Sequence, residues 1–308
     1  MNGHQQHARA LECISGLITL SYNRGSAIDA PVMNDRTPPL LDRVREYWQE
    51  HPLFSYELSQ PGSPEFFDQL DDLKRNDVER FTQAYWSFEQ FHGKNVLDVG
   101  CGPGWLTIKY VEAGANVWSI DLTPRAVELA RRFLAMRGLS AVVTEASAED
   151  LPFDEGAFDL VVSSGVIHHT ADIPAAFREC QRVLKPGGLA KVTLYCKGIL
   201  HHPVVFPFTR LAMRLSNVKH PGSDLARTSN GVDDFIRRYD GERNPVGVGH
   251  TVAGWRKLLL AAGFKIRRHE IHFFPLRFVP YGHMIPRSAH LLLDRFLGTM
   301  VYFDLEKP

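Results

Sequence analysis

A short run of residues carries the clearest chemical signal in this chain. The stretch Asn95–Gly104 reads NVLDVGCGPG, an apolar run with an acid followed by glycines at alternate positions, Gly100, Gly102 and Gly104. Glycine lets the backbone approach a ligand where any Cβ would clash. Asp121 ends the next apolar run, where a carboxylate can accept hydrogen bonds from both hydroxyls of a ribose. A strand, a glycine turn, a helix and a second strand ending in an acid predict a nucleoside-binding unit.

The glycine spacing separates two classes of nucleoside-binding protein. Dinucleotide enzymes use G-x-G-x-x-G and seat a pyrophosphate on the helix N-terminus. Here the spacing is G-x-G-x-G, and Pro103 suits the first turn of a helix. Asp98 would repel a pyrophosphate, but it suits a ligand that carries an ammonium and a sulfonium. The pattern therefore disfavours a nicotinamide oxidoreductase.

Four segments in a fixed order resemble the class I S-adenosylmethionine-dependent methyltransferases, and among them the UbiE-like, type 11 group. The segments read VLDVGCGPG, SIDLTPRAVELAR, EDLPFDEGAFDLVVSSGVIHH and RVLKPGGLA, and the resemblance covers residues 93–196. It implies an α/β fold: a Rossmann-like doubly wound sheet, mostly parallel with an antiparallel last strand, plus helical cap insertions. It also implies S-adenosylmethionine as the cofactor, with S-adenosylhomocysteine as the product.

The resemblance implies a cofactor site that follows the strand ends. The glycine turn would pass under the methionine part, Asp121 would hold the ribose and Leu122 would lie against the adenine. The complete expected set is Asp98, Gly100, Cys101, Gly102, Gly104, Asp121, Leu122, Ser147, Ala148 and Ser164.

One position departs from the family pattern. The family usually has an aspartate two residues before the Glu149–Asp150 pair, where this chain has Ser147. A serine hydroxyl can accept the same hydrogen bond from the adenine amino group, but without charge assistance. We expect Ser147 with the Ala148 amide to bind adenine. The alternatives are that Glu149 substitutes or that cofactor affinity is modest.

Two histidines follow the fourth predicted strand. Methyl transfer from a sulfonium is an in-line displacement that mainly needs positioning in a dry cavity, and it needs a base only for a protonated, weakly acidic acceptor. The stretch His168-His169-Thr170-Ala171-Asp172 matches the His and Asp, but not the Trp, of the H-x-W-x-D stretch of plant-type O-methyltransferases. We expect His168 as the base, with His169 second. The alternative is that both pack against the cofactor.

The segments around the predicted core are expected to supply the acceptor site. Arginine forks a carboxylate well, so Arg238 and Arg243 are candidate anchors for an acidic group; the alternative is a salt-bridged surface. The expected acceptor-binding residues are Tyr56, Tyr195, Arg238, Tyr239, Arg243 and His250. No H-x-x-x-H or Cys/His cluster occurs, so no metal is expected.

Apolar periodicity and turn residues divide the chain into five parts. Residues 1–38 form a poorly patterned extension, 39–92 a helical cap, 93–196 the cofactor-binding core, 197–250 an inserted cap and 251–308 the completion of the core with an insertion at 275–297. Strands are expected at 94–99, 115–121, 141–146, 158–164, 189–196, 264–273 and 299–306. Helices are expected at 41–50, 65–91, 103–114, 123–137, 172–184 and 251–262.

The amino-acid composition bears on the partners of the protein and on its cellular location. The 35 basic and 35 acidic residues balance, and no basic stripe interleaves with aromatics, so no nucleic-acid partner is expected. Four cysteines without paired spacing indicate a reducing, cytoplasmic location. No apolar run reaches the length of a membrane span. A homodimer remains possible.

These observations predict methyl transfer from S-adenosylmethionine to a small molecule. O-methylation is slightly favoured over N-, S- or C-methylation, in specialised metabolism. The alternatives are a quinone-type C-methyltransferase, or a protein or cyclase that binds S-adenosylmethionine without transferring its methyl group.

Overall fold

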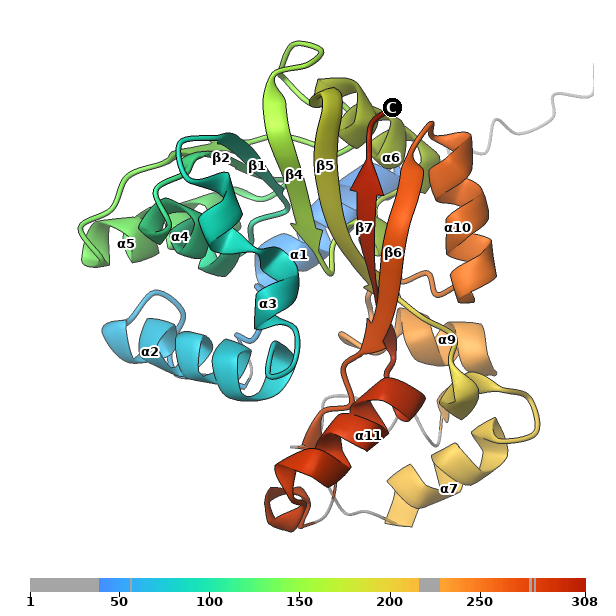
Figure 1. Cartoon of the computed structure of the whole chain (residues 1–308). Coiled ribbons are helices and arrows are strands. Elements are labelled where there is room, and N and C mark those ends of the chain that lie inside the picture. Colours follow the sequence, from blue (N-terminus) through green and yellow to red (C-terminus); the bar gives the residue numbers. More distant parts are fainter. Residues whose placement is uncertain (1–38, 56, 216–227, 277–278, 280) are drawn as a thin grey trace, which may run out of the picture. The chain divides into compact units, whose positions relative to one another are not determined.

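The computed structural model describes residues 39–55, 57–215, 228–276, 279 and 281–308, so the predicted extension 1–38 and Tyr56 lie outside the described residues. Seven strands form one sheet in the order β3-β2-β1-β4-β5-β7-β6 (Figure 1). The strands are β1 Asn95–Val99, β2 Asn116–Asp121, β3 Val142–Glu145, β4 Phe158–Ser164, β5 Leu184–Tyr195, β6 Lys265–His272 and β7 Met300–Glu306.

The sheet confirms the predicted doubly wound class. Strands β1 to β5 pair in parallel, whereas β7 runs antiparallel between β5 and β6. The one clear difference is at β5, which begins at Leu184 and so includes residues 185–188, which precede the predicted strand 189–196. In this segment the Gly187 amide donates to the carbonyl of Lys307, so backbone pairing with the chain's last residues extends the strand.

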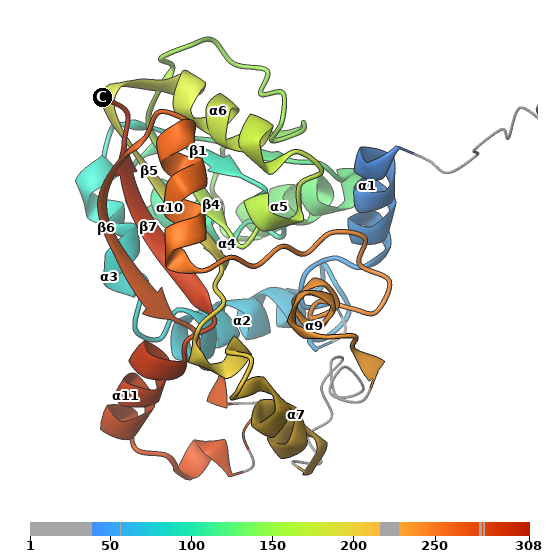
Figure 2. The same ribbon diagram turned by 90° about the vertical axis from the view of Figure 1, so that its right-hand side faces the viewer.

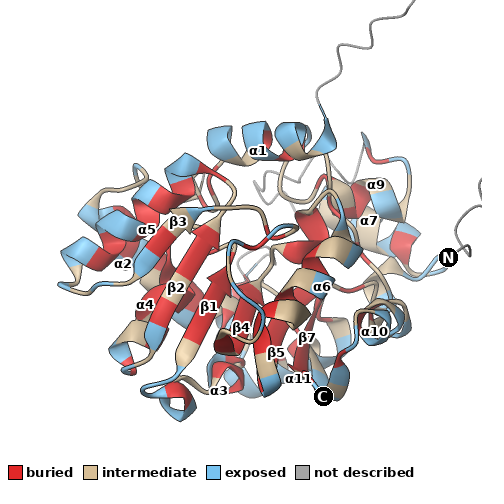
Figure 3. Ribbon diagram, turned by 90° about the horizontal axis from the view of Figure 1, so that it is seen from above, coloured by how far each residue is buried: buried red, intermediate tan, exposed pale blue. Residues whose placement is uncertain are grey.

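Helices cover both faces of the sheet, and the alternation of strand residues explains how. Val96 packs with Tyr110 of α4 (Trp105–Glu112), whereas Leu97 packs with Phe177 of α6 (Ile173–Val183). Successive strand residues point to opposite faces, so both must be apolar in a covered sheet. The remaining core helices are α5 Pro124–Met136 and α10 Val252–Ala261. Figure 3 shows the buried strands and the exposed outer faces of the helices.

The core helices begin where the sequence predicts. Thr123 caps α5 by accepting a 3.3 Å hydrogen bond from the Ala126 amide, and Pro124 takes the first helical position. The predicted continuous helix 65–91 is wrong. It divides into several pieces because a π-helical turn follows Leu73 and because Ser87 adopts a positive φ of 52°. The pieces are α2 Pro64–Leu73, η1 Lys74–Val78, α3 Gln83–Trp86 and η2 Phe88–Phe91.

The other helices surround the carboxyl edge of the sheet (Figures 1 and 2). They are α1 Leu40–Glu50, η3 Ile167–His169, η4 Ile199–His201, α7 Phe206–Leu215, α9 Val232–Arg237, η6 Gly282–Met284 and α11 Arg287–Leu297. The described part from residue 39 onward packs as one compact unit, so the predicted boundaries between caps and core stay predictions.

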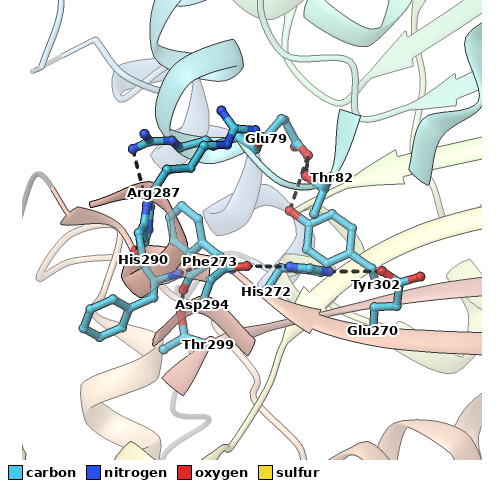
Figure 4. A network of polar contacts seen from close by, with 12 residues as sticks. Glu79, Thr82, Glu270, His272, Phe273, Arg287, His290, Asp294, Thr299 and Tyr302 are labelled. Carbon is cyan, nitrogen blue, oxygen red and sulfur yellow. Dashed lines mark hydrogen bonds and ion pairs between the residues drawn. The ribbon is translucent and has the colours of Figure 1, made fainter. Parts of the chain in front are cut away.

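A buried polar network fixes α11 to the end of β6 (Figure 4). The His272 ring bonds Asp294 at 2.5 Å through Nδ1 and Glu270 at 3.1 Å through Nε2. The other oxygen of Asp294 accepts hydrogen bonds from the amides of Phe273 and Phe274, at 2.8 and 3.0 Å. Burial alone would lower the pKa of His272, but these two carboxylates outweigh it and raise that pKa above its usual 6.5.

This network predicts a pH-dependent stability. Because the folded pKa of His272 is raised, its stabilisation is complete below the unfolded pKa of about 6.5 and is lost as pH rises through the folded value. Asp294→Asn keeps an oxygen for the two amides but removes the charge. We expect a loss of about 3 kcal/mol in unfolding free energy at about pH 5.5, and a smaller loss at about pH 9.

Denaturant unfolding of both proteins at the two pH values measures this difference. Glu306→Gln is the matched control, because Glu306 pairs only with exposed or half-exposed Lys265 and Arg267 among the ion pairs described. A loss in Asp294→Asn that is equal at both pH values would contradict the assignment to His272.

Candidate cofactor and acceptor site

A pocket opens at the carboxyl edge of the parallel strands, where open α/β sheets bind ligands. Nine of the ten predicted cofactor residues line it, which brings together the ends of β1, β2 and β4 and the loop after β3. The tenth residue, Gly104, does not line the pocket, and its φ is +90°. A Cβ there would lie 3.0 Å from Cβ of Ala130, so this glycine lets α4 approach α5.

The first position of the turn must be glycine, because a neighbouring side chain lies too close for a Cβ atom. Gly100 has φ of +74°, and a Cβ there would lie 2.3 Å from a methyl carbon of Val166 in the loop after β4. The amides of Gly100 and Cys101 both donate to the carbonyl of Ile120 at 2.9 Å. The turn is therefore held against β2 on one side and against the β4 loop on the other.

Asp121 organises this turn in addition to any contact with ribose. One carboxylate oxygen accepts from the Gly102 amide at 3.0 Å, and the other accepts from the amide and hydroxyl of Thr123, both at 3.0 Å. Burial raises the pKa of Asp121, and these donors offset part of the rise. The same carboxylate thus aligns the glycine turn and the start of α5.

Asp98 and Lys74 place one acidic and one basic side chain in the pocket wall. Thr107 donates to the Asp98 carboxylate at 2.8 Å, and burial raises the pKa of Asp98 to about 7. A bound cation would favour the ionised form of this acid. Lys74 is the one lysine or arginine among the described residues of the pocket wall, and its ammonium lies 3.9 Å from Glu79. Sequence analysis missed Lys74 because a lysine in a helical run reads as a solvated residue.

The loop after β3 contains the unusual serine at the pocket wall. Ser147, Ala148 and Glu149 all line the pocket, and the Ser147 hydroxyl accepts from the Glu149 amide at 3.1 Å. A Glu149 carboxylate oxygen accepts from the amides of Ala171 and Asp172, at 2.7 and 3.1 Å. Glu149 is therefore engaged with the loop after β4, which favours Ser147 as the adenine partner.

The two candidate histidines differ in position. His169 lines the pocket, whereas His168 is fully buried behind it and neither of its ring nitrogens has a hydrogen-bond partner. Burial lowers the pKa of His168. The Nδ1 of His169 lies 2.6 Å from the carbonyl of Val246, to which it must donate, and Nε2 lies 3.2 Å from an oxygen of Asp240.

The predicted acceptor residues divide into two groups. Tyr195 donates to Asp240 at 2.5 Å and so joins His169 at one carboxylate. The ring of Tyr239 lies edge-on to Tyr195 with centroids 5.9 Å apart. Asp240 was missed because a lone acid in a loop has no sequence signature. Its backbone carbonyl accepts from Tyr47 of α1 at 2.6 Å.

The remaining predicted acceptor residues have other partners. Arg238 is buried and bonds Asp234 at 3.3 Å and Glu242 at 2.8 Å. Arg243 is exposed, and the ring of His250 packs edge-on against Trp255 at 4.7 Å. These three are not brought to the pocket wall described above.

Two negative findings apply to the described residues. They contain no group of three or more His, Cys, Asp or Glu side chains arranged to hold a metal ion. None of their helices has the length and apolarity needed to cross a bilayer.

Known proteins resemble the part of the chain that builds this pocket. Residues 97–192 match the family described as "Methyltransferase domain". A ubiquinone biosynthesis O-methyltransferase of Xanthomonas euvesicatoria is 40% identical over 146 residues, 47% of this chain and 57% of that protein. One from Cereibacter sphaeroides is 35% identical over 116 residues, 38% of this chain and 45% of that protein.

A third relative, from Oryza sativa subsp. japonica, carries the name 2-methyl-6-phytyl-1,4-hydroquinone methyltransferase 1, chloroplastic. It is 41% identical over 102 residues, 32% of this chain and 30% of that protein. The chain thus spans between about a third and somewhat over half the length of these curated relatives.

Solved structures support the fold. The methyltransferase in a complex with a Haloferax volcanii methyltransferase activator superimposes with a TM-score of 0.52 at 17% identity, covering 79% of this chain and 95% of that one. A Bacillus halodurans protein described as a methyltransferase gives 0.50 at 19% identity, covering 73% and 98%.

Sheet order, glycine turn and sequence relatives agree on one class. The chain contains the core of a class I S-adenosylmethionine-dependent methyltransferase, and S-adenosylmethionine is the cofactor of that core.

The Asp121 geometry predicts a loss of cofactor affinity on neutralisation. Asp121→Asn removes charge from three hydrogen bonds, so we expect the Kd for S-adenosylmethionine to rise roughly 10- to 100-fold. Calorimetric titration measures this value. Glu145→Gln is the matched control, because Glu145 lies opposite Asp121 in register but pairs with Arg45 at the surface. Equal affinity of Asp121→Asn and wild type would exclude the assigned role.

Proposed function

We propose that this protein transfers the methyl group of S-adenosylmethionine to a hydroxyl group of a small aromatic molecule. The single observation that carries the proposal is the pocket, in which the cofactor-type residues and His169 share one wall. The relatives named ubiquinone biosynthesis O-methyltransferases support an oxygen atom as the acceptor of the methyl group. The segments 197–250 and 275–297, which the quoted family motifs do not cover, support an acceptor of specialised metabolism.

Each part of the pocket has a distinct task in this reaction. The cofactor supplies an electrophilic methyl group on a sulfonium. Asp98 offers a carboxylate to its positive groups, and Lys74 offers an ammonium to its carboxylate. Leu41, Val44 and Trp48 of α1 cover the pocket with apolar surface, which excludes water from the line of displacement.

We assign His169, rather than His168, as the base that removes the proton from the hydroxyl group of the acceptor. The carbonyl of Val246 holds the proton on Nδ1 of His169, which leaves Nε2 as the nitrogen able to accept another. In the structure, Nε2 of His169 lies 3.2 Å from an oxygen of Asp240. A hydroxyl that replaces Asp240 at Nε2 would meet an imidazole in the tautomer of a general base.

This assignment predicts unequal effects of two substitutions. His169→Gln should lower kcat about 100-fold or more, while cofactor affinity changes little. His168→Gln should cause the smaller loss in kcat, because His168 does not reach the pocket wall. Initial rates over a pH series measure both. A larger effect of His168→Gln in a folded protein would reverse the assignment.

A second candidate function is C-methylation of a quinol ring. The rice relative named for a hydroquinone favours it, although that match covers only 32% of this chain. Carbon methylation would need no proton acceptor at a hydroxyl, so the two chemistries differ in the product and in the role of His169.

Turnover tests the proposed function. We expect the full chain to bind S-adenosylmethionine and S-adenosylhomocysteine and to methylate members of a panel of phenols and hydroquinones. Mass spectrometry of the isolated product with a labelled methyl group distinguishes O- from C-methylation. Tight cofactor binding without any methylated phenol, hydroquinone, amine or thiol would favour a protein that binds the cofactor without methyl transfer.

A further inference from the structure

Exposed apolar side chains concentrate in two segments of the described chain. Thirteen large apolar residues are exposed, and nine of them lie in residues 199–211 and 281–296. The most exposed are Tyr281 at 76%, Phe296 at 73%, Met284 at 71% and Phe208 at 69%. Single exposed apolar residues need no explanation, but such a concentration marks an interaction surface.

The two segments lie at the same end of the molecule. Residues 199–214 and 281–297, which we call the apolar end, contain η4, α7, η6 and α11, and they form the lower end in Figures 1 and 2. Helices η4 and α11 are in contact. The arrowheads of β4 and β6 in Figure 1 point toward this end, so it extends beyond the strand edge that bears the cofactor pocket.

Helix α11 is inverted relative to an ordinary helix of a water-soluble protein. His290 and Asp294, four residues apart, face inward and are 2% and 4% exposed. Leu292 and Phe296, also four residues apart, face outward and are 58% and 73% exposed. Residues at this spacing share one helix face, so polar groups are inside and apolar groups outside.

Specific bonds hold this inverted orientation (Figure 4). Asp294 accepts from two backbone amides and pairs with His272, and His290 Nε2 lies 2.8 Å from the carbonyl of Phe274. Rotation of α11 to bury its leucines would break all of these bonds. The outward apolar face is therefore a stable feature of the fold.

The charge of the apolar end indicates its partner. The two segments carry four arginines, and their one carboxylate, Asp294, is buried. The chain as a whole has zero formal charge, so this region is locally basic. Helices with outward apolar residues flanked by arginine are typical of proteins that lie on an anionic lipid surface.

We propose that the apolar end docks on the interface of an anionic lipid bilayer. Phe208, Leu292 and Phe296 would enter the boundary between headgroups and acyl chains, while the arginines contact lipid phosphates. The pocket would then open toward the membrane side of the protein. This proposal concerns docking only and does not depend on methyl transfer.

A second copy of the chain fits this surface less well. In a symmetric dimer, the apolar end of one subunit would face the apolar end of the other. Each subunit would contribute four arginines and no exposed carboxylate from these two segments. Opposed like charges disfavour that contact, whereas lipid phosphates complement the same arginines.

Vesicle flotation of the full chain tests the proposal. We expect the protein to float with vesicles of phosphatidylcholine and phosphatidylglycerol, and much less with phosphatidylcholine alone. Phe208→Ser/Phe296→Ser should weaken binding roughly tenfold or more. Arg214→Gln/Arg295→Gln should remove the preference for the anionic lipid, and added salt should have the same effect.

Met136→Ser/Leu260→Ser is the matched control, because these two residues are 40% and 54% exposed on α5 and α10, away from the apolar end. It should float like wild type, and all variants should keep wild-type melting temperatures and cofactor affinity. Absence of wild-type flotation would overturn the proposal, as would equal flotation of the double phenylalanine variant. A concentration-dependent dimer that this variant abolishes, without flotation, would assign the surface to a second copy instead.

Discussion

The rest of the candidate site depends on the hydrogen bonds that the carboxylate of Asp121 accepts. This carboxylate accepts hydrogen bonds from the backbone of two connections, the glycine turn at Gly102 and the start of α5 at Thr123. Parallel pairing brings both connections to one edge of the sheet, so a single acid can reach them. Its burial is unfavourable for the charge, and the converging donors offset that cost. These hydrogen bonds hold the glycine turn in its positive-φ conformation. A ligand in the pocket would contact the backbone in that conformation.

The two halves of the site are built by different means. The cofactor half comes from consecutive strand ends of one contiguous core. The group proposed for the acceptor side is assembled from remote segments, since Asp240 accepts hydrogen bonds from Tyr47, 193 residues earlier, and from Tyr195, 45 residues earlier. Satisfied polar groups in a partly buried site favour one arrangement over others, because any shift leaves a donor or acceptor unpaired.

Polar contacts also decide the orientation of α11. An ordinary surface helix turns its leucines toward the core, but here the inward positions are occupied by His290 and Asp294. The amides of Phe273 and Phe274 both donate to Asp294, and Phe273 has a positive φ of 75°. Turning the leucines inward would break this charged network, whose hydrogen bonds therefore fix the orientation of the helix.

The sequence by itself determined the sheet and its glycine turn, and nine of the ten residues that it predicts for the cofactor site line the pocket. Those features follow from local rules: apolar runs covered on both faces, glycine where φ is positive, and Thr123-Pro124 at a helix start. Only the tertiary structure decided that Lys74 faces the pocket, that Asp240 joins His169, and that His168 lies behind the wall. These placements depend on how segments far apart in the chain pack together. Periodicity within a segment contains no information on that packing.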